Sequence, residues 1–309
     1  MRKAVKIWLI TAAFLAVLGG VLFVGAAAAS GWDYTRLGAT RYETNTYEPG
    51  EAFDKISIGV GTADIEFAPS GDGRCRIVCF EAENMRHSAA VRNGTLVIGT
   101  VDTRKWYDYI GILNFYEKPV MTVYLPQKAY VSLKIAAATG NVTIPGDFAF
   151  EALEISTSTG NITVDAPSVG ALRLAAATGG IRVSSVVSEG RLELKTSTGA
   201  VKLTDVACAD LSAESSTGTI TLNNVTAAGS FSIRSGTGGV RFENSDAARI
   251  SVRTSTGSVT GTLRSEKIFI TETSTGKTEV PRTLAGGRCE ITTSTGDIRI
   301  TLSAGTRER

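Results

Sequence analysis

Histidine is the scarcest of the chemically versatile residues in this chain, whose 309 residues include only His87. One histidine excludes His-rich metal sites and leaves a single possible histidine-based catalytic triad. The nearest carboxylates in the sequence are Glu81 and Glu83, on a segment that we interpret as strand and loop, and we expect His87 to lie at the surface. Phosphate-binding loops and dinucleotide-binding glycine motifs are also absent from the sequence. We therefore predict no catalytic residue, no metal site and no bound cofactor.

An excess of one charge is lacking as well. The chain carries 32 Lys and Arg against 30 Asp and Glu, and three of the basic residues, Arg2, Lys3 and Lys6, belong to the N-terminal segment. Subtracting these three leaves 29 basic residues and a net charge near −1 for the remainder. A nearly neutral exterior of this kind argues against nucleic acid as a partner.

Cysteine is sparse, with four in the whole chain. Cys75 and Cys79 are four residues apart, which is too far for a disulfide along one strand. Cys208 and Cys289 lie in the second half of the chain, and Cys289 occupies an apolar position of the repeat described below. We expect all four thiols to be unpaired, while distant partners for Cys75 and Cys79 stay open.

Only one long apolar run is present, at residues 7–29, and its 23 residues are uncharged. A run of this length can span a bilayer. The basic residues before it predict a cytoplasmic N-terminus. Residues 1–30 are thus expected to anchor a single-pass protein in the bacterial membrane, with the C-terminal domain extracytoplasmic. A cleaved signal peptide ending in the small residues 26–30 is the alternative, although the apolar core of such peptides is usually only about 7–15 residues long.

A short repeat dominates the second half of the chain. Nine Thr-Gly pairs recur there at intervals of 19 or 20 residues. Their glycines are Gly140, Gly160, Gly179, Gly199, Gly218, Gly238, Gly257, Gly276 and Gly296. A fixed period of this size indicates a solenoid, in which each unit covers only its neighbours.

Within each repeat, apolar and polar residues alternate before the glycine and again after it, as in residues 153–164. This alternation is typical of strands that bury one face. Seven residues before the glycine, eight of the nine repeats have Leu, Ile or Phe, and the ninth has Cys289. The pattern predicts an all-β, parallel β-solenoid with stacked apolar columns, and each glycine is expected at a structural turn that needs a positive φ. Outward charges such as Lys134, Glu154, Arg173 and Glu193 alternate in sign and predict a solvated face of neighbouring-strand pairs.

One repeat departs from this register. Strict counting from Gly276 points Ile268 and Ile270 outward. We expect a one-residue bulge near Thr271 or Glu272 that returns both isoleucines to the interior.

The organisation of the remainder follows from the repeat. Residues 56–67, ISIGVGTADIEF, match it with Ala63 in the glycine position and predict a cryptic first coil. Strand-like runs at 76–80, 95–100 and 120–125 predict an inserted, mainly antiparallel sheet that covers the N-terminal end of the solenoid. The predicted parts are an anchor at 1–30, a linker at 31–50, the first coil with its capping sheet at 51–132, and a solenoid of nine Thr-Gly coils at 133–309.

The concentration of aromatic residues in the insertion marks the candidate contact surface. Residues 105–118 read KWYDYIGILNFYEK. The five candidate ligand-contact residues are Trp106, Tyr107, Tyr109, Phe115 and Tyr116. Exposed aromatic rings stack on sugars or enter membrane interfaces, whereas packing of these rings onto the solenoid is the alternative.

Two other functions fit the sequence less well. Polysaccharide cleavage needs carboxylates gathered on neighbouring coils, but Glu154 and Glu193 are interleaved with Arg173. Ice binding needs outward Thr-x-Thr rows, but strand alternation places Thr157 and Thr159 on the inward face, where we expect an internal ladder of hydroxyl groups.

These features together resemble the bacterial putative-adhesin family, a domain of unknown function described by its β-strand repeats. The motifs that carry the resemblance are TADIEF at 62–67, STGNITV at 158–164, STGTITL at 216–222 and STGDIRI at 294–300. The resemblance covers roughly residues 50–302 and implies a surface-located, non-enzymatic domain.

We therefore expect a cell-surface binding, adhesion or scaffold protein of the bacterial envelope. A cell-wall glycan or another envelope protein is the expected partner. The resemblance also leaves open a component of envelope-stress sensing, and a carbohydrate-active enzyme is a more distant alternative.

Overall fold

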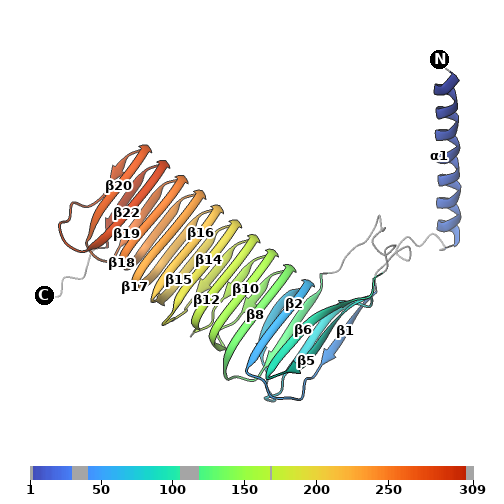
Figure 1. Cartoon of the computed structure of the whole chain (residues 1–309), viewed down its shortest axis with the longest axis horizontal. Coiled ribbons are helices and arrows are strands. Elements are labelled where there is room, and N and C mark those ends of the chain that lie inside the picture. The colour runs from blue at the N-terminus through green and yellow to red at the C-terminus, as the bar shows by residue number, and fades with distance from the viewer. Residues whose placement is uncertain (1–2, 30–40, 105–117, 168, 304–309) are drawn as a thin grey trace.

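The computed structural model describes residues 3–29, 41–104, 118–167 and 169–303, and it consists of one helix followed by strands (Figure 1). The helix, α1 (Lys3–Ala29), includes a 21-residue apolar stretch, Val5–Gly25, long enough to cross a membrane. None of that stretch is buried against the rest of the protein. The apolar run expected from the sequence is thus a helix, and its apolar stretch is exposed in the part of the chain that the structure describes.

The strands form two facing rows, connected by the repeat corners. The first row runs in spatial order through β5 (Met85–Arg92), β6 (Thr95–Asp102), β2 (Lys55–Thr62), β8 (Ala129–Thr139), β10 (Ala149–Thr159), β12 (Val169–Thr178), β14 (Arg191–Thr198), β16 (Asp210–Thr217), the later part of β17 (Ile220–Thr237), the later part of β18 (Val240–Thr256), β22 (Gly287–Thr295) and β20 (Lys267–Thr275). From β6 onward every neighbouring pair in this row is parallel. The expected parallel β-solenoid is confirmed.

The second row faces the first across the core. It runs through β1 (Tyr42–Tyr47), β4 (Arg76–Ala82), β7 (Val120–Leu125), β3 (Asp64–Pro69), β9 (Val142–Ile144), β11 (Ile162–Val164), β13 (Ile181–Ser184), β15 (Val201–Cys208), the early parts of β17 and β18, β19 (Val259–Leu263), β23 (Ile298–Leu302) and β21 (Thr278–Glu279). The result is the rod of stacked arrows in Figure 1.

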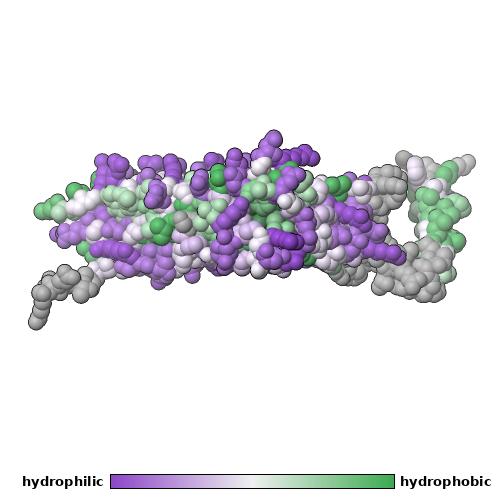
Figure 2. All heavy atoms as spheres, turned by 90° about the horizontal axis from the view of Figure 1, so that it is seen from below, coloured by the Kyte–Doolittle hydropathy of each residue, from purple (hydrophilic) through white to green (hydrophobic). Residues whose placement is uncertain are grey.

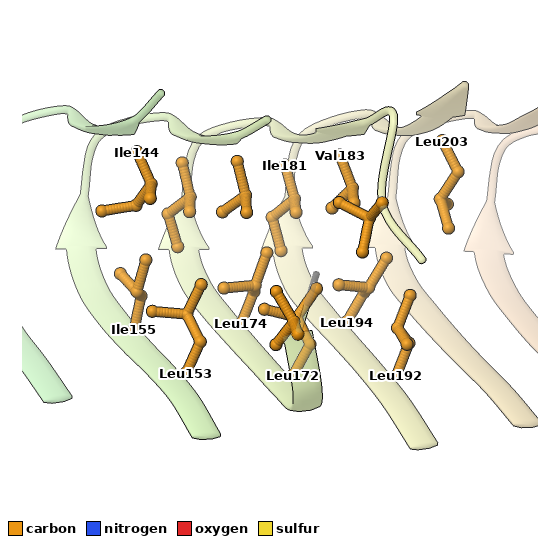
Figure 3. Packing of buried hydrophobic residues seen from close by; sticks show 14 of the residues in the cluster. Ile144, Leu153, Ile155, Leu172, Leu174, Ile181, Val183, Leu192, Leu194 and Leu203 are labelled. Atoms are coloured by element: carbon orange, nitrogen blue, oxygen red, sulfur yellow. The ribbon is translucent and has the colours of Figure 1, made fainter. Parts of the chain in front are cut away.

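The core lies between the rows as columns of aliphatic side chains. Leu153, Leu172 and Leu192 from the first row lie in register and are at most 1% exposed. Ile181 and Leu203, from the facing row, point toward them (Figure 3). Burying each such side chain stabilises the fold by about 1.5–3 kcal/mol, so every coil depends on the coils above and below it.

At the Thr-Gly corners the backbones of neighbouring coils lie in direct contact. All nine glycines have positive φ, between 141° and 155°. A Cβ built on Gly160 would lie 1.9 Å from the carbonyl oxygen of Gly140, and Gly179 makes the same approach to Gly160. Glycine is therefore required for two reasons. It adopts the positive φ without strain, and it leaves room for the backbone of the neighbouring coil where a side chain would otherwise lie.

Three antiparallel strands cover the N-terminal end of the solenoid. Strand β4 pairs with β7, and β1 pairs in turn with β4. Strand β5 pairs with β6, and all three pairings are antiparallel. The strands β6 and β7 are themselves parallel to β2 and β3, and they extend the stack by one layer. Residues 42–47, expected as part of a linker, instead form the edge strand of this cap, because Tyr42 stacks on Phe80 and Asn45 reaches Glu81.

The last two coils are stacked in the reverse of their sequence order. Strand β22 pairs with β18 on one side and with β20 on the other, and Gly296 accordingly lies on Gly257 while Gly276 lies on Gly296. In the coil formed by β20 and β21, Thr271 and Thr278 pair with Ile291 and Ile298, which are buried in the neighbouring coil. Placing this more polar coil at the end leaves the more apolar coil of β22 and β23 inside the stack, where burial of aliphatic side chains stabilises the fold most.

The bulge expected in β20 is wrong. Lys267 to Thr273 pair residue by residue with β22, and Ile268 and Ile270 point outward with 45% and 48% of their surface exposed. At the end of the stack Phe269 is only half-buried, so shifting the register would gain little burial.

Candidate functional site

The predicted aromatic contact segment cannot be placed. Trp106, Tyr107, Tyr109, Phe115 and Tyr116 lie outside the described residues. In the sequence this segment stands between β6 and β7, and these two strands belong to the N-terminal layer. Its role as a ligand-contact surface stays a prediction.

The single histidine belongs to a buried polar cluster in the cap, contrary to the expectation of a surface residue. His87 on β5 is 5% exposed, and its Nδ1 lies 2.5 Å from Oε2 of Glu81 on β4. The backbone N–H of His87 donates to the same oxygen at 2.7 Å. Asn45 and Tyr47 on β1 donate to Oε1 of Glu81 at 2.8 and 2.7 Å. Of the partners in this network, only Glu81 could be predicted from the sequence, because it stands six residues before His87.

The hydrogen bonds fix the charge state of the cluster. Burial by itself would raise the pKa of Glu81, but the hydrogen bonds from Tyr47, Asn45 and His87 together lower it below the ordinary value. Burial, followed by the hydrogen bond to Glu81, raises the pKa of Tyr47, and burial raises the pKa of the Cys79 thiol to about 12. These shifts favour an ionised Glu81 beside a protonated Tyr47 and a protonated Cys79.

Cys79, Glu81 and His87 also bring three possible metal-ligating atoms within 4.8 Å of one another. Each carboxylate oxygen of Glu81 already accepts two hydrogen bonds. Cys79 is fully buried in the core, and its raised pKa favours the protonated thiol over the thiolate that a metal needs. The geometry fits a saturated structural network that joins β1, β4 and β5 better than an open coordination site.

A surface cleft of ≈ 470 Å³ lies beside the cap, where β1 leads into the first coil. Its lining includes Phe53, Arg74 and Lys128 together with the acidic Glu48 and Glu51. The Nζ of Lys128 donates to the carbonyl of Phe53 at 2.5 Å. Charges of both signs line the cleft, so it shows no preference for an anionic or a cationic ligand.

The hydroxyl groups at the corners form one inward and one outward column. Thr157 is buried and Thr196 donates to the carbonyl of Gly179 at 2.9 Å, so the expected internal ladder exists. Thr159, expected on the same face as Thr157, is exposed instead. The register of β10 with β8 skips residue 158, which reverses the alternation just before the glycine.

Outward charges along the first row pair between neighbouring coils over the first part of the solenoid. Lys134 lies 3.2 Å from Glu154, and Arg173 lies 3.6 Å from Glu193. Lys195 continues the pattern with Glu214, at 3.3 Å. The expected solvated face of alternating charge is confirmed for these coils.

The alternation ends at β17. The outward residues of β17, β18 and β22 include four arginines, which we call the arginine face: Arg234, Arg249, Arg253 and Arg288. Among the described residues, only Arg288 of these four forms an ion pair, with Glu290. Two shallow grooves of ≈ 420 and ≈ 410 Å³ lie between the arginines. The sequence carries a signal for this cluster, because its arginines stand four or eight residues before a repeat glycine, whereas the alternating charges Lys134, Glu154, Arg173 and Glu193 stand six residues before one.

The fold has relatives among solved structures. A putative adhesin from Parabacteroides merdae is 14% identical, with a TM-score of 0.51 over 84% of this chain and 96% of that chain. A putative adhesin from Parabacteroides distasonis is 11% identical, with a TM-score of 0.51 over 84% of this chain and 97% of that one. No curated protein matches the sequence.

At these identities the similarity establishes the fold alone. The family model described as Toastrack DUF4097 matches residues 53–303, from the first coil to the end of the solenoid. The chain belongs to the Toastrack DUF4097 family.

Proposed function

We propose that this protein is a single-pass membrane protein whose solenoid binds or scaffolds partners at the outer side of the bacterial cell membrane, without catalysis. The basic residues Arg2, Lys3 and Lys6 before the apolar stretch of α1 support a cytoplasmic N-terminus. The printed names of the two Parabacteroides proteins, putative adhesins, support a surface-binding role.

The observation that carries the proposal is the repetition of outward side chains along a rod. Each coil contributes one residue to every outward column, and neighbouring coils are about 4.8 Å apart. Hydrophilic side chains occur along the whole rod in Figure 2, while α1 carries a concentrated hydrophobic run. Such a surface offers many equivalent contacts to an extended partner, which suits binding or scaffolding.

The buried cluster in the cap supports binding rather than catalysis. Its thiol, on Cys79, and its imidazole, on His87, are 0% and 5% exposed, and Glu81 already accepts four hydrogen bonds. A catalytic group has to reach its substrate, and both side chains are buried. The cluster is therefore assigned to holding the cap together.

Retention on isolated cell walls tests the proposal. The full-length chain in uncharged detergent micelles is expected to co-sediment with cell walls and not with dextran beads. Absence of retention would favour the envelope-stress signalling role instead. The Trp106→Ala/Tyr107→Ala variant tests the aromatic segment, because unchanged retention would remove that segment from the binding surface.

Orientation is tested separately with Thr198→Cys. Thr198 is exposed on β14, whereas the four native cysteines are buried. A membrane-impermeant maleimide is expected to label the variant in intact cells. Labelling only after the cells are lysed would place the solenoid in the cytoplasm.

A further inference from the structure

The arginine face departs from the charge pattern of the rest of the rod. Arg234 and Arg253 are direct neighbours in the parallel pairing of β17 with β18. Arg249 and Arg288 immediately precede Ile250 and Cys289, which are paired on β18 and β22, so these two arginines are also neighbours on adjacent strands. Like charges on adjacent strands repel each other, and such pairs destabilise a sheet. Coils nearer the N-terminus avoid this repulsion with ion pairs, so the arginine face carries a cost that folding does not require.

Few acidic groups offset these arginines. Glu290 contacts Arg288, and Glu214 on the adjacent β16 is already paired with Lys195. Asp210, also on β16, accepts hydrogen bonds from the backbone N–H and the hydroxyl of Ser230, and its charge is attracted more weakly to Arg191 and Arg249. The guanidinium groups of Arg234, Arg249 and Arg253 form no ion pair or hydrogen bond within the part of the chain that the structure describes. Their donors are available to a ligand.

Short hydroxyl side chains form the floor between the arginines. Ser232 and Ser251 are paired neighbours that line the groove beside Arg249 and Arg288. The second groove is lined by Arg234 and Arg253 together with Ser216, Gly236 and Ser255. One carboxylate borders each groove, Glu290 the first and Glu214 the second, and both are held in the ion pairs described above. Long guanidinium groups above a serine floor leave space for a ligand and add further hydrogen-bond donors.

The chemistry of these donors selects an anion with planar or tetrahedral oxygens. Guanidinium groups bind carboxylates and phosphates through paired hydrogen bonds. Arginines on successive coils repeat at about 4.8 Å, and two grooves lie side by side, so several anionic groups of one chain could be bound together. We propose that the arginine face is the binding site for a linear polyanion of the cell wall, carrying a phosphate or carboxylate on each repeating unit.

The position of the face on the rod favours a polymer over a lipid surface. Strand β18 lies seven coils along the stack from β2, or roughly 34 Å from the end of the solenoid into which α1 leads. The apolar side chains between the arginines, Phe231 and Ile250, are buried, so they are not accessible to acyl chains. This inference rests on the proposed surface-binding function and names its ligand class.

Binding of defined polyanions by the full-length chain in uncharged micelles tests the inference. The probes are polyphosphate and polygalacturonate, with dextran as the neutral polymer. Arg234→Ser/Arg253→Ser is expected to weaken binding of the polyanions at least tenfold at physiological salt. The matched control is Lys134→Ser/Arg173→Ser, which removes two cations from the same row of strands and is expected to change binding less than twofold. Equal weakening in both variants would overturn the assignment, as would a wild-type chain that binds neither polyanion.

Two further measurements separate the remaining outcomes. Binding to anionic lipid vesicles but to neither polymer would replace the polymer with a lipid surface and overturn the inference. Undiminished retention of Arg234→Ser/Arg253→Ser on cell walls would also overturn it, although the proposed binding function would stand. Since Arg253→Glu replaces a like-charge neighbour of Arg234 with an opposite charge, it is expected to raise Tm while weakening polyanion binding. A lower Tm together with unchanged binding would show that the arginines serve the fold rather than a ligand.

Discussion

At the scale of single residues, the corners and the cap cluster place the strictest demands on the sequence. The Thr-Gly glycines combine positive φ with contact to the carbonyl of the neighbouring coil. The need for a positive φ can be predicted from the sequence, because each glycine stands between two strand-like stretches where the chain has to turn. The contact between coils is evident only in the three-dimensional structure. The cluster around His87 was not predictable, because its donors Asn45 and Tyr47 come from a strand 36 and 34 residues away from Glu81.

Substitution of a corner glycine should be costly. In Gly199→Ala the added Cβ would lie 2.1 Å from the carbonyl oxygen of Gly179, at a φ of 154°. The conformational strain alone costs about 1–3 kcal/mol, so we expect a loss of at least about 2 kcal/mol in the free energy of unfolding. Chemical denaturation measures it. Gly59→Ala is the control, because no atom lies within 4 Å of its Cβ position; equal losses in both variants would contradict the role of the corner.

The inward hydroxyl column should stabilise each corner modestly. Thr196→Val removes the hydrogen bond to the carbonyl of Gly179, and we expect a loss of about 1 kcal/mol. Thr198→Val, at the exposed position two residues later, should change the free energy of unfolding by less than half of that amount. Denaturation of both variants compares the two columns, and an equal effect would assign no special role to the inward hydroxyl groups.

The cap should lose stability in acid through Glu81. Since the pKa of Glu81 is lowered in the folded state, its contribution is complete above the unfolded pKa of about 4.5 and is lost as the pH falls through the folded value. We expect the Tm of the wild-type chain to fall more steeply between pH 5 and pH 3 than that of Glu81→Gln. Glu66→Gln, which alters an exposed carboxylate, should retain the wild-type slope. A wild-type slope in Glu81→Gln would contradict the network.

At the scale of elements, the period of 19 or 20 residues predicted the strands, the columns and the corners, but not the order of the last two coils. Periodic coils present nearly equivalent faces to one another, so the period does not encode which coils are neighbours. Specific contacts supply that information. The buried Lys267 lies 2.6 Å from Asp246, and Gly287 permits close approach to the carbonyl of Ala248.

Engineered disulfides test the coil order. Thr256 and Thr295 are paired neighbours on adjacent strands, which suits the Cα separation of about 4.4–6.8 Å that a disulfide needs. Thr256→Cys/Thr295→Cys should therefore cross-link under mild oxidation. Thr256→Cys/Thr275→Cys, which joins coils consecutive in sequence, should not, because those positions are two coils, or about 9.6 Å, apart. Non-reducing electrophoresis and peptide mass spectrometry show which of the two variants cross-links. The opposite pattern would contradict the reversed order of the last two coils.

At the scale of the whole molecule, the protein is a rod with an apolar helix before its capped end (Figure 1). The arginine face lies on β17, β18 and β22, toward the other end of the rod. The net charge of the sequence predicts a nearly neutral exterior. Because net charge is summed over the whole chain, it does not reveal the local excess of positive charge on the arginine face. The proposed binding function depends on the outward columns being aligned from coil to coil, because only alignment brings Arg234 beside Arg253 and Ser232 beside Ser251.

Distances between spin labels along the exposed threonine column measure this alignment directly. With Thr139→Cys as the common partner, labels at Thr237→Cys, Thr256→Cys and Thr295→Cys lie five, six and seven coils away. Pulsed electron resonance on the full-length chain in micelles should give distances near 24, 29 and 34 Å, rising by about 4.8 Å per coil. Distances that do not rise steadily in this order would contradict the stacked solenoid and the binding surface built on it.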